Sequence, residues 1–198
     1  MTTRSLAPLR AGLISAALTM GILAQGPIPP ASAATNWRID PARTHIAFAI
    51  DAIGYPRTHG QFRQFAGRIS VDFAHPDKSS VSFHVQSRSV DVGSASFDDY
   101  LRSDAFLNSE RFPSIDFVSN SVSRVDDHTV RVNGQLTLLG VTRPLTVDVA
   151  VEREAGGGQR LAFLAKTDIN RLEFGMNAGF PLVSRDVELV ISSAAVEL

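Results

Sequence analysis

The sequence predicts an all-β domain, an antiparallel barrel of about eight strands with one short helix, on three observations. Apolar and polar residues alternate with a period of two along many short stretches, as they do in strands that bury one face. Turn-forming residues such as Asp40-Pro41 and the triplet Gly156-Gly157-Gly158 separate these stretches. A helical pattern occurs in one place only, between residues 96 and 103. Short strands that curve around an apolar interior account for all three observations.

The first segment, residues 1 to about 33, is predicted to be a cleaved secretory signal peptide. Arg4 and Arg10 precede an apolar run, residues 11–24, that carries no charge and is shorter than the roughly 20 residues a membrane-spanning helix needs. Ala31-Ser32-Ala33 then matches a small-x-small cleavage site. An uncleaved anchor helix is the alternative, and the short run disfavours it. We therefore expect a periplasmic or secreted protein.

The mature domain, residues 34–198, follows this segment and has the length of a single domain. Its alternating stretches, in chain order, are 46–50, 81–85, 130–138, 145–151, 161–165 and 187–191. One further stretch changes phase, because Phe62 lies on the even face while Phe65 and its neighbours to Phe73 lie on the odd face. A bulge or sharp bend near Gln64 to Gly67 reconciles the two faces, and such bends are typical of closing barrels.

The helix is predicted over about residues 96–103. Ser96 is a suitable N-cap, and Asp99 follows three residues later, as in a capping box. Phe97, Tyr100 and Leu101 lie at i, i+3 and i+4 and form one apolar face. We expect this helix to cover one end of the barrel.

Composition excludes several classes of site and partner. The chain has no cysteine, which excludes disulfides, thiolate sites and a lipoprotein anchor. Without the two arginines of the signal segment, the sequence has 17 basic and 20 acidic residues, so no nucleic-acid partner is expected. The histidines lack the close spacing of metal ligands, and no metal site is predicted; they are His45, His59, His75, His84 and His128.

Charged clusters offer two weaker hypotheses. The first hypothesis is a pair of carboxylates for acid–base chemistry, drawn from Asp98, Asp99 and Asp104. Acidic residues in a first helical turn, however, also interact favourably with the helix dipole. The second hypothesis is an anion site at a barrel mouth, where arginines bind a phosphate or pyrophosphate; its members are Arg57, Arg88 and Arg102. Solvated surface side chains are the simpler interpretation of both clusters.

A series of short motifs occurs in order along nearly the whole mature chain. They are Trp37-Arg38-Ile39-Asp40-Pro41, the GxFxxFxG pattern of Gly60 to Gly67, Ser89-Val90-Asp91, the stretch Tyr100 to Asn108 followed by Phe112-Pro113, the stretch Gly134 to Pro144, Asn170 to Met176, and Val187-Glu188-Leu189. Together they resemble the YceI family of periplasmic, lipocalin-like, polyisoprenoid-binding proteins. Two departures occur: Tyr100 stands where the family usually has histidine, and Asp104 comes one place early, with Ala105 following.

The resemblance implies an extended lipocalin-like barrel that holds an isoprenoid lipid or quinone in an apolar tunnel and needs no other cofactor. All 12 phenylalanines lie in the mature part, which suits such a tunnel but equally suits a solid core. The residues predicted to line the tunnel are Phe48, Ile50, Phe65, Ile69, Phe83, Phe117, Leu136, Leu138, Phe163 and Phe174. Arg57 and Arg102 are the candidates for contact with a head group.

Two other functions are compatible with the pattern. A lipid-processing enzyme would use the wet-face histidines or the helix carboxylates, with His59, His84 and Asp99 as its test residues. An outer-membrane barrel would also show alternation, but few aromatic residues are placed for its interface girdles. The preferred interpretation is a binding protein that is not integral to the membrane. Exposed strand edges would also permit a homodimer.

Overall fold

The structure is a computed structural model that describes residues 35–153 and 160–198. The predicted signal peptide and its cleavage site lie outside the described residues, as does the predicted turn at 156–158. The strands are β1 (Thr35–Ile39), β2 (His45–Ala52), β3 (Tyr55–Phe62), β4 (Phe65–Val71), β5 (Ser80–Gln86), β6 (Val90–Asp91), β7 (Ser114–Arg124), β8 (Thr129–Leu138), β9 (Val141–Arg153), β10 (Arg160–Asn170) and β11 (Val183–Glu197). One α-helix, α1 (Ala95–Arg102), and four short 3-10 turns complete the described elements.

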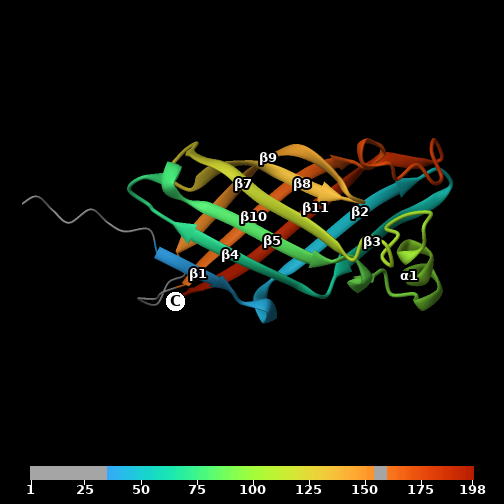
Figure 1. Cartoon of the computed structure of the whole chain (residues 1–198), viewed down its shortest axis with the longest axis horizontal. Coiled ribbons are helices and arrows are strands. Elements are labelled where there is room, and N and C mark those ends of the chain that lie inside the picture. Colours follow the sequence, from blue (N-terminus) through green and yellow to red (C-terminus); the bar gives the residue numbers. More distant parts are fainter. Residues whose placement is uncertain (1–34, 154–159) are drawn as a thin grey trace, which may run out of the picture. The chain divides into compact units, whose positions relative to one another are not determined.

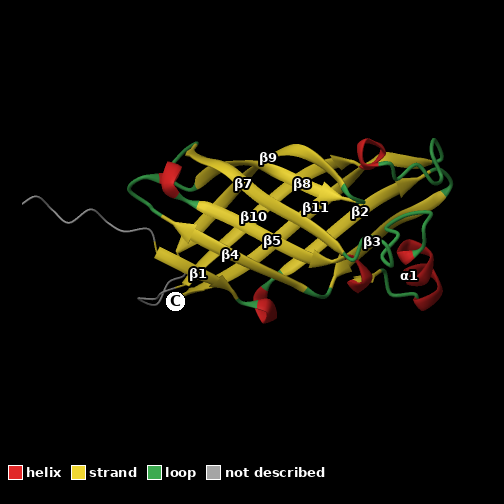
Figure 2. Ribbon diagram, in the orientation of Figure 1, coloured by secondary structure: helices red, strands yellow, loops and turns green. Residues whose placement is uncertain are grey.

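The strands form a closed antiparallel barrel (Figures 1 and 2). Neighbouring strands pair in the order β1-β4-β5-β7-β8-β9-β10-β11, and β11 pairs back with β1, so that eight strands complete the ring. All described pairings are antiparallel, with Trp37 opposite Glu197 at the closure and opposite Ile69 on the other side. The all-β barrel of about eight strands that the sequence predicts is confirmed.

Strands β2, β3 and β6 continue the sheet toward one end of the barrel. β11 pairs with β1 through Ala195 to Glu197 and with β2 through its preceding residues, so β1 and β2 follow one edge of the same long strand. β3 and β4 are likewise consecutive, and Arg63 and Gln64 between them belong to neither strand. This interruption overlaps the bend predicted from the change of phase. It lets β3 pair with β2 and β6 while β4 pairs with β1 and β5.

The barrel keeps a free strand edge in the part of the chain that the structure describes. The strand order ends at β6, which has two residues and pairs only with Gln61 and Phe62 of β3. The residues of β3 from Tyr55 to Gly60 therefore have no partner among the described strands on that side. The homodimer stays a prediction.

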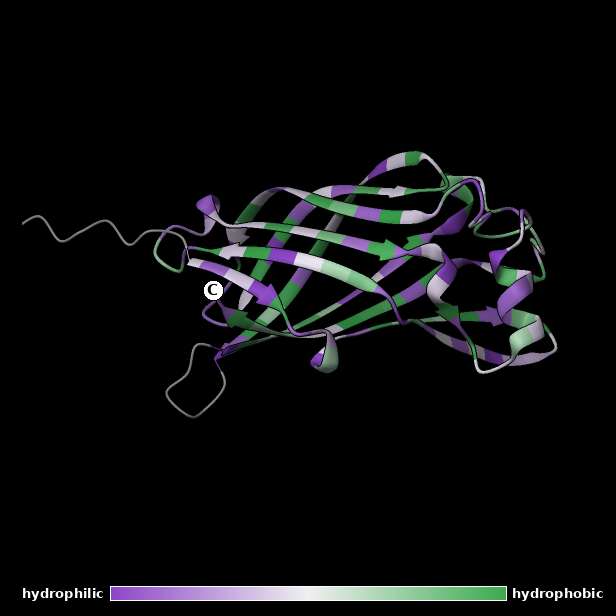
Figure 3. Ribbon diagram, turned by 60° about the horizontal axis from the view of Figure 1, so that its bottom comes forward, coloured by the Kyte–Doolittle hydropathy of each residue, from purple (hydrophilic) through white to green (hydrophobic). Residues whose placement is uncertain are grey.

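Hydrophobic and hydrophilic residues alternate along the strands (Figure 3), which gives each strand one apolar face and one polar face. In β8, Val132 is buried whereas its neighbour Arg131 is exposed. Arg131 opposes Asp148 of β9 and donates two hydrogen bonds to its carboxylate, at 2.7 and 2.8 Å. This outer ion pair lowers the pKa of Asp148 through the hydrogen bond from Arg131. Charged pairs on the outer wall are the reverse of the arrangement in an outer-membrane barrel, which turns apolar side chains outward.

Helix α1 lies at one end of the barrel, as predicted, but its predicted cap is wrong. The N-cap is Ser94 rather than Ser96, because Gly93, with a φ of 80°, turns the chain and lets the helix begin at Ala95. The backbone N–H of Asp98 donates to the carbonyl of Ser94 at 2.8 Å, and the Asp98 carboxylate accepts from the N–H of Val92 at 2.7 Å. Asp98 therefore anchors the first turn, the part that the capping box assigned to Asp99.

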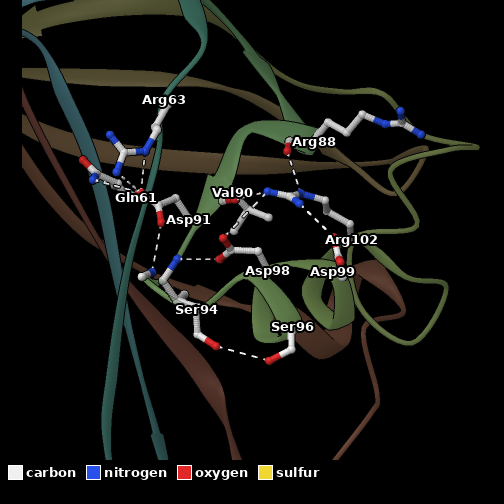
Figure 4. A network of polar contacts seen from close by, with 12 residues as sticks. Gln61, Arg63, Arg88, Val90, Asp91, Ser94, Ser96, Asp98, Asp99 and Arg102 are labelled. Atoms are coloured by element: carbon white, nitrogen blue, oxygen red, sulfur yellow. Dashed lines mark hydrogen bonds and ion pairs between the residues drawn. The ribbon is translucent and has the colours of Figure 1, made fainter.

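Arg102 anchors the last turn of α1 to the segment that precedes the helix (Figure 4). Its Nε donates to the carbonyl of Arg88 at 2.8 Å and one Nη to the carbonyl of Val90 at 2.9 Å. The other Nη lies 3.0 Å from the carboxylate of Asp99. Hydrogen bonds from a charged group to backbone carbonyls are among the stronger ones, so the helix is held firmly at both ends.

Candidate functional site

The barrel encloses a cavity of about 610 Å³. Inward-facing side chains of every described strand except β1 line it, and almost all are apolar. Most are valine, isoleucine, leucine or phenylalanine, the residue types that period-two alternation places on the inner face. The interior is therefore partly hollow. Alternation alone does not distinguish a hollow interior from a solid core.

Eight of the ten predicted apolar residues lie on the cavity wall: Phe48, Ile50, Ile69, Phe83, Phe117, Leu136, Leu138 and Phe163. Phe65 and Phe174 do not. Phe65 packs against the cluster around Trp37 and Leu161, and Phe174 is buried in a second cluster with Phe106. The other buried members of the Phe174 cluster, among them Phe106, line the cavity themselves, so Phe174 packs behind the wall rather than on it. The binding role of all ten stays a prediction.

Much of the wall was missed by the sequence prediction, although the signal was present. The missed residues on β8 and β9 share the inward face with Leu136 and Leu138 and follow from the same alternation; they are Val130, Val132, Leu145, Val147, Val149 and Val151. The apolar face of α1 also reaches the cavity through Phe97, Tyr100 and Leu101. Its position over the barrel end depends on the hydrogen bonds of Arg102 and Asp98, which no periodicity reveals.

Two glycines of the GxFxxFxG pattern explain how aromatic side chains fit inside. A Cβ at Gly60 would collide with the ring of Phe48, and a Cβ at Gly67 would collide with Ile39. Both glycines thus leave room for a large side chain from a neighbouring strand. The pattern therefore shapes the inner wall through absent side chains as well as through its phenylalanines.

The helix end of the cavity is aromatic. The rings of Tyr100 and Phe106 meet edge to face with centroids 5.1 Å apart, and Phe97 stacks on Tyr100 at 6.3 Å. Tyr100, which stands where the YceI family usually has histidine, lies on the cavity wall but is half exposed to solvent. A phenol ring thus lies at this end in place of an imidazole.

The opposite end of the cavity is polar. Loops between β4 and β5 and between β7 and β8 meet there (Figure 1), and they contribute Asp72, Arg124, Asp126, Asp127 and His128 to the wall. Asp72 is buried and accepts hydrogen bonds from the backbone N–H groups of Ala74 and His75, at 2.9 and 2.8 Å. The N–H of His75 is the main cause that holds the pKa of Asp72 below its ordinary value, while burial opposes it.

The lowered pKa of Asp72 predicts a contribution to stability that depends on pH. A carboxyl group with a folded-state pKa below its unfolded value stabilises the fold above the unfolded pKa, near 4, and loses this effect as the pH falls through the folded pKa. Asp72→Asn keeps one acceptor oxygen but does not titrate. We expect it to be less stable than the parent at neutral pH, with a difference that shrinks below about pH 4. Urea unfolding across this pH range measures the effect, and a constant difference would contradict it.

The structure brings neither Arg57 nor Arg102 to the cavity. Arg57 lies on the outer wall and forms ion pairs with Asp51 and Glu188, each at 3.4 Å. Arg102 lies beside Arg88 in a second, polar pocket of about 530 Å³ outside the barrel. The predicted arginine cluster is thus divided, and the role of Arg57 and Arg102 at a head group stays a prediction that their positions do not support.

A buried arginine that the sequence prediction missed does reach the cavity wall. Arg171 opens the short 3-10 turn Arg171–Phe174 after β10, and its side chain is almost wholly inaccessible to solvent. Its guanidinium donates to the carbonyls of Met176, Val183 and Ser184, at 2.5, 3.0 and 2.7 Å. Burial lowers its pKa. Arg171 thereby holds the segment before β11 against the end of the barrel.

The residues proposed for an enzyme lie away from the cavity. His59 and His84 are exposed on the outer wall, where the Nδ1 atom of His84 lies 2.6 Å from a carboxylate oxygen of Asp116. Asp99 is exposed and paired with Arg102. In residues 35–153 and 160–198, no group of three or more histidines and carboxylates is placed to hold a metal ion. Over the same residues, no helix has the length and apolar character needed to cross a membrane.

Comparison with known proteins agrees with this architecture. Residues 37–195 match the YceI-like domain. The chain is 34% identical to a UPF0312 protein of Shewanella denitrificans over 82% of this chain and 87% of that protein, and 33% identical to protein YceI of Salmonella arizonae over 83% and 88%.

Solved structures share the fold at lower identity. BcnA of Burkholderia cenocepacia superposes with a TM-score of 0.75 at 22% identity, over 80% of this chain and 99% of BcnA. A polyisoprenoid binding domain from Saccharophagus degradans superposes with a TM-score of 0.65 at 14% identity, over 82% and 98%. The family resemblance predicted from the motifs is confirmed. The chain belongs to the YceI-like family.

Proposed function

We propose that this protein binds an isoprenoid lipid, a polyisoprenoid or a quinone, inside the barrel and carries or sequesters it. The observation on which the proposal depends is the cavity of about 610 Å³ with its almost wholly apolar wall. This volume lies within the range of roughly 300–1,000 Å³ that is typical of small-molecule sites. An apolar chain gains about 0.8 kcal/mol for each methylene group that leaves water, so a long, unbranched or methyl-branched tail suits the wall.

The aliphatic middle of the cavity supports a tail rather than a polar ligand. Valines of β8 and β9 form one side of the wall, and Phe83, Phe117 and Phe163 contribute rings from three other strands. Five polar or charged side chains gather at the loop end, and the rest of the wall adds only a few more, among them Thr58, Thr167 and Arg171. A structural relative, from Saccharophagus degradans, is described as polyisoprenoid-binding, which fits the same ligand class. The chemistry of this interior thus favours binding over a reaction, and no enzymatic step forms part of the proposal.

The proposed place of action is the periplasm or the exterior of the cell. Its support is the sequence of the first 33 residues, with two arginines, a charge-free apolar run and the Ala31-Ser32-Ala33 site. A carrier there would move a lipid through water that the lipid cannot cross alone.

Native mass spectrometry of the gently purified protein tests the proposal. We expect a bound apolar molecule, identified after extraction as an isoprenoid, or uptake of added farnesol by the delipidated protein. The proposal is refuted if no lipid co-purifies and the delipidated protein also takes up no farnesol.

A further inference from the structure

Two loops at the end of the barrel near α1 expose large apolar side chains to solvent. We name these side chains, Ile53, Tyr55, Phe180 and Leu182, the apolar tip. They are 71%, 78%, 53% and 62% exposed. Ile53 and Tyr55 flank the turn between β2 and β3, and Phe180 and Leu182 precede β11; both segments lie at this end in Figure 1.

Backbone hydrogen bonds hold the two loops together as one surface. The N–H of Ile53 donates to the carbonyl of Leu182 at 2.8 Å. Ala52 pairs with Val183 across the β2–β11 ladder and with Tyr55 across the β2–β3 turn. The two loops are therefore joined at the point where β2 meets β11. Arg171 supports the second loop from within through its bonds to Met176, Val183 and Ser184.

Charge is absent from the tip itself and begins directly behind it. Residues 52–56 (AIGYP) and 177–183 (NAGFPLV) contain no charged side chain. Arg57 directly follows the first segment and Arg185 follows the second after Ser184; both guanidinium groups are exposed and paired with Asp51, Glu188 and Asp186. An uncharged apolar edge with two aromatic residues, with charge only behind it, is the arrangement of a protein surface that enters the interface of a bilayer.

The tip is continuous with the cavity. Ala52, Gly179 and Val183, from the same two loops, line the cavity wall. A ligand at this end of the cavity thus lies directly beneath the exposed apolar side chains. Exposed apolar groups of this kind on a single domain mark an interaction site.

From these observations we propose that the apolar tip docks on the surface of a lipid bilayer, so that the ligand passes between bilayer and cavity without crossing water. The inference depends on the proposed function, because an isoprenoid lipid dissolves in a bilayer and not in water. A bilayer fits the tip better than a protein partner does, since the tip carries no charge and adjoins the wall of a cavity whose proposed ligand is itself a lipid.

The test is co-sedimentation of the purified protein with vesicles of phosphatidylethanolamine and phosphatidylglycerol. We expect the parent to bind and Leu182→Asp to bind at least about tenfold more weakly. The substitution removes a leucine side chain that would enter the bilayer and puts a charge in its place. Leu164→Asp is the matched control: Leu164 is 52% exposed on the outer face of β10, away from the tip, and its variant is expected to bind as the parent does.

A spectroscopic measurement locates the contact. Phe180→Trp is expected to show a blue-shifted emission on vesicle addition and quenching by brominated lipid. The natural Trp37 is buried at the other end of the barrel and gives a constant background. Farnesol uptake, measured without vesicles, is expected to be unchanged in Leu182→Asp, which separates failure of docking from failure of the cavity.

Three results would overturn docking on a bilayer. The parent could fail to bind vesicles, or Leu164→Asp could lose as much binding as Leu182→Asp. Thirdly, Leu182→Asp could abolish a self-associated form of the parent in gel filtration without any vesicle binding, which would make a second copy the occupant of the tip. Loss of farnesol uptake by the parent, with vesicle binding intact, would instead refute the proposed function.

Discussion

Replacing Ala165 with tryptophan is expected to abolish uptake of a long isoprenoid while the barrel stays folded. Ala165 faces the cavity from the middle of β10, between Val149 of β9 and Ile191 of β11. An indole side chain has about 150–250 Å² of surface to bury and would enter the space that the tail needs. The cavity gives it room, so the packing strain that usually accompanies a small-to-large change in a core is reduced. Titration with an isoprenoid alcohol, read by native mass spectrometry, measures the loss.

Leu164→Trp is the control for this experiment. Leu164 is the neighbouring residue on β10, and its side chain points to the outer face. We expect this variant to bind as the parent does and to unfold at a similar urea concentration. If Ala165→Trp is folded and binds the isoprenoid alcohol as tightly as the parent does, the ligand does not occupy the middle of the barrel.

Replacing Arg171 with methionine is expected to destabilise the protein by about 3 kcal/mol or more, since each buried polar group left without a partner costs about 1–3 kcal/mol. The change keeps much of the side-chain volume but removes the donors to the carbonyls of Met176, Val183 and Ser184. Relief from burying a charge offsets part of this loss. The midpoint of urea unfolding measures the result.

Arg171→Lys separates charge from geometry. A lysine keeps the positive charge but lacks the planar guanidinium that donates to all three carbonyls. We therefore expect the stability of Arg171→Lys to lie between those of the parent and Arg171→Met. In both variants, amide hydrogen exchange is expected to accelerate most, relative to the parent, in the segment from Gly175 to Ser184. A methionine variant as stable as the parent would mean that water satisfies these carbonyls.

The strands and their inward faces were largely predictable, because side-chain alternation is a local property. Leu136, Leu138 and Phe163 lie on the cavity wall where the pattern placed them. Phe65 and Phe174 pack against residues of the wall without lining the cavity, and no local pattern distinguishes a side chain on the wall from one behind it. That distinction depends on how many side chains from distant strands meet at one place.

Charged residues were harder to assign. Arg102 was a candidate for a head group, and the structure shows that it holds α1 through the carbonyls of Arg88 and Val90. Arg171 belongs to the motif from Asn170 to Met176 but was given no role from the sequence, yet it is buried at the cavity wall. A long charged side chain reaches partners several residues away in any direction, so its role follows from the position of backbone groups that only the folded chain brings near.

By itself, the sequence determined that the chain forms short antiparallel strands with one apolar face in a barrel of about eight strands, that one helix interrupts them near residues 96–103, and that its motifs are those of the YceI-like family. The tertiary structure alone decided that β11 pairs with both β1 and β2, which strands close the ring, and that a cavity remains inside. The physical reason is range: alternation is written in adjacent residues, whereas closure and the empty volume depend on hydrogen bonds and contacts between the two ends of the domain.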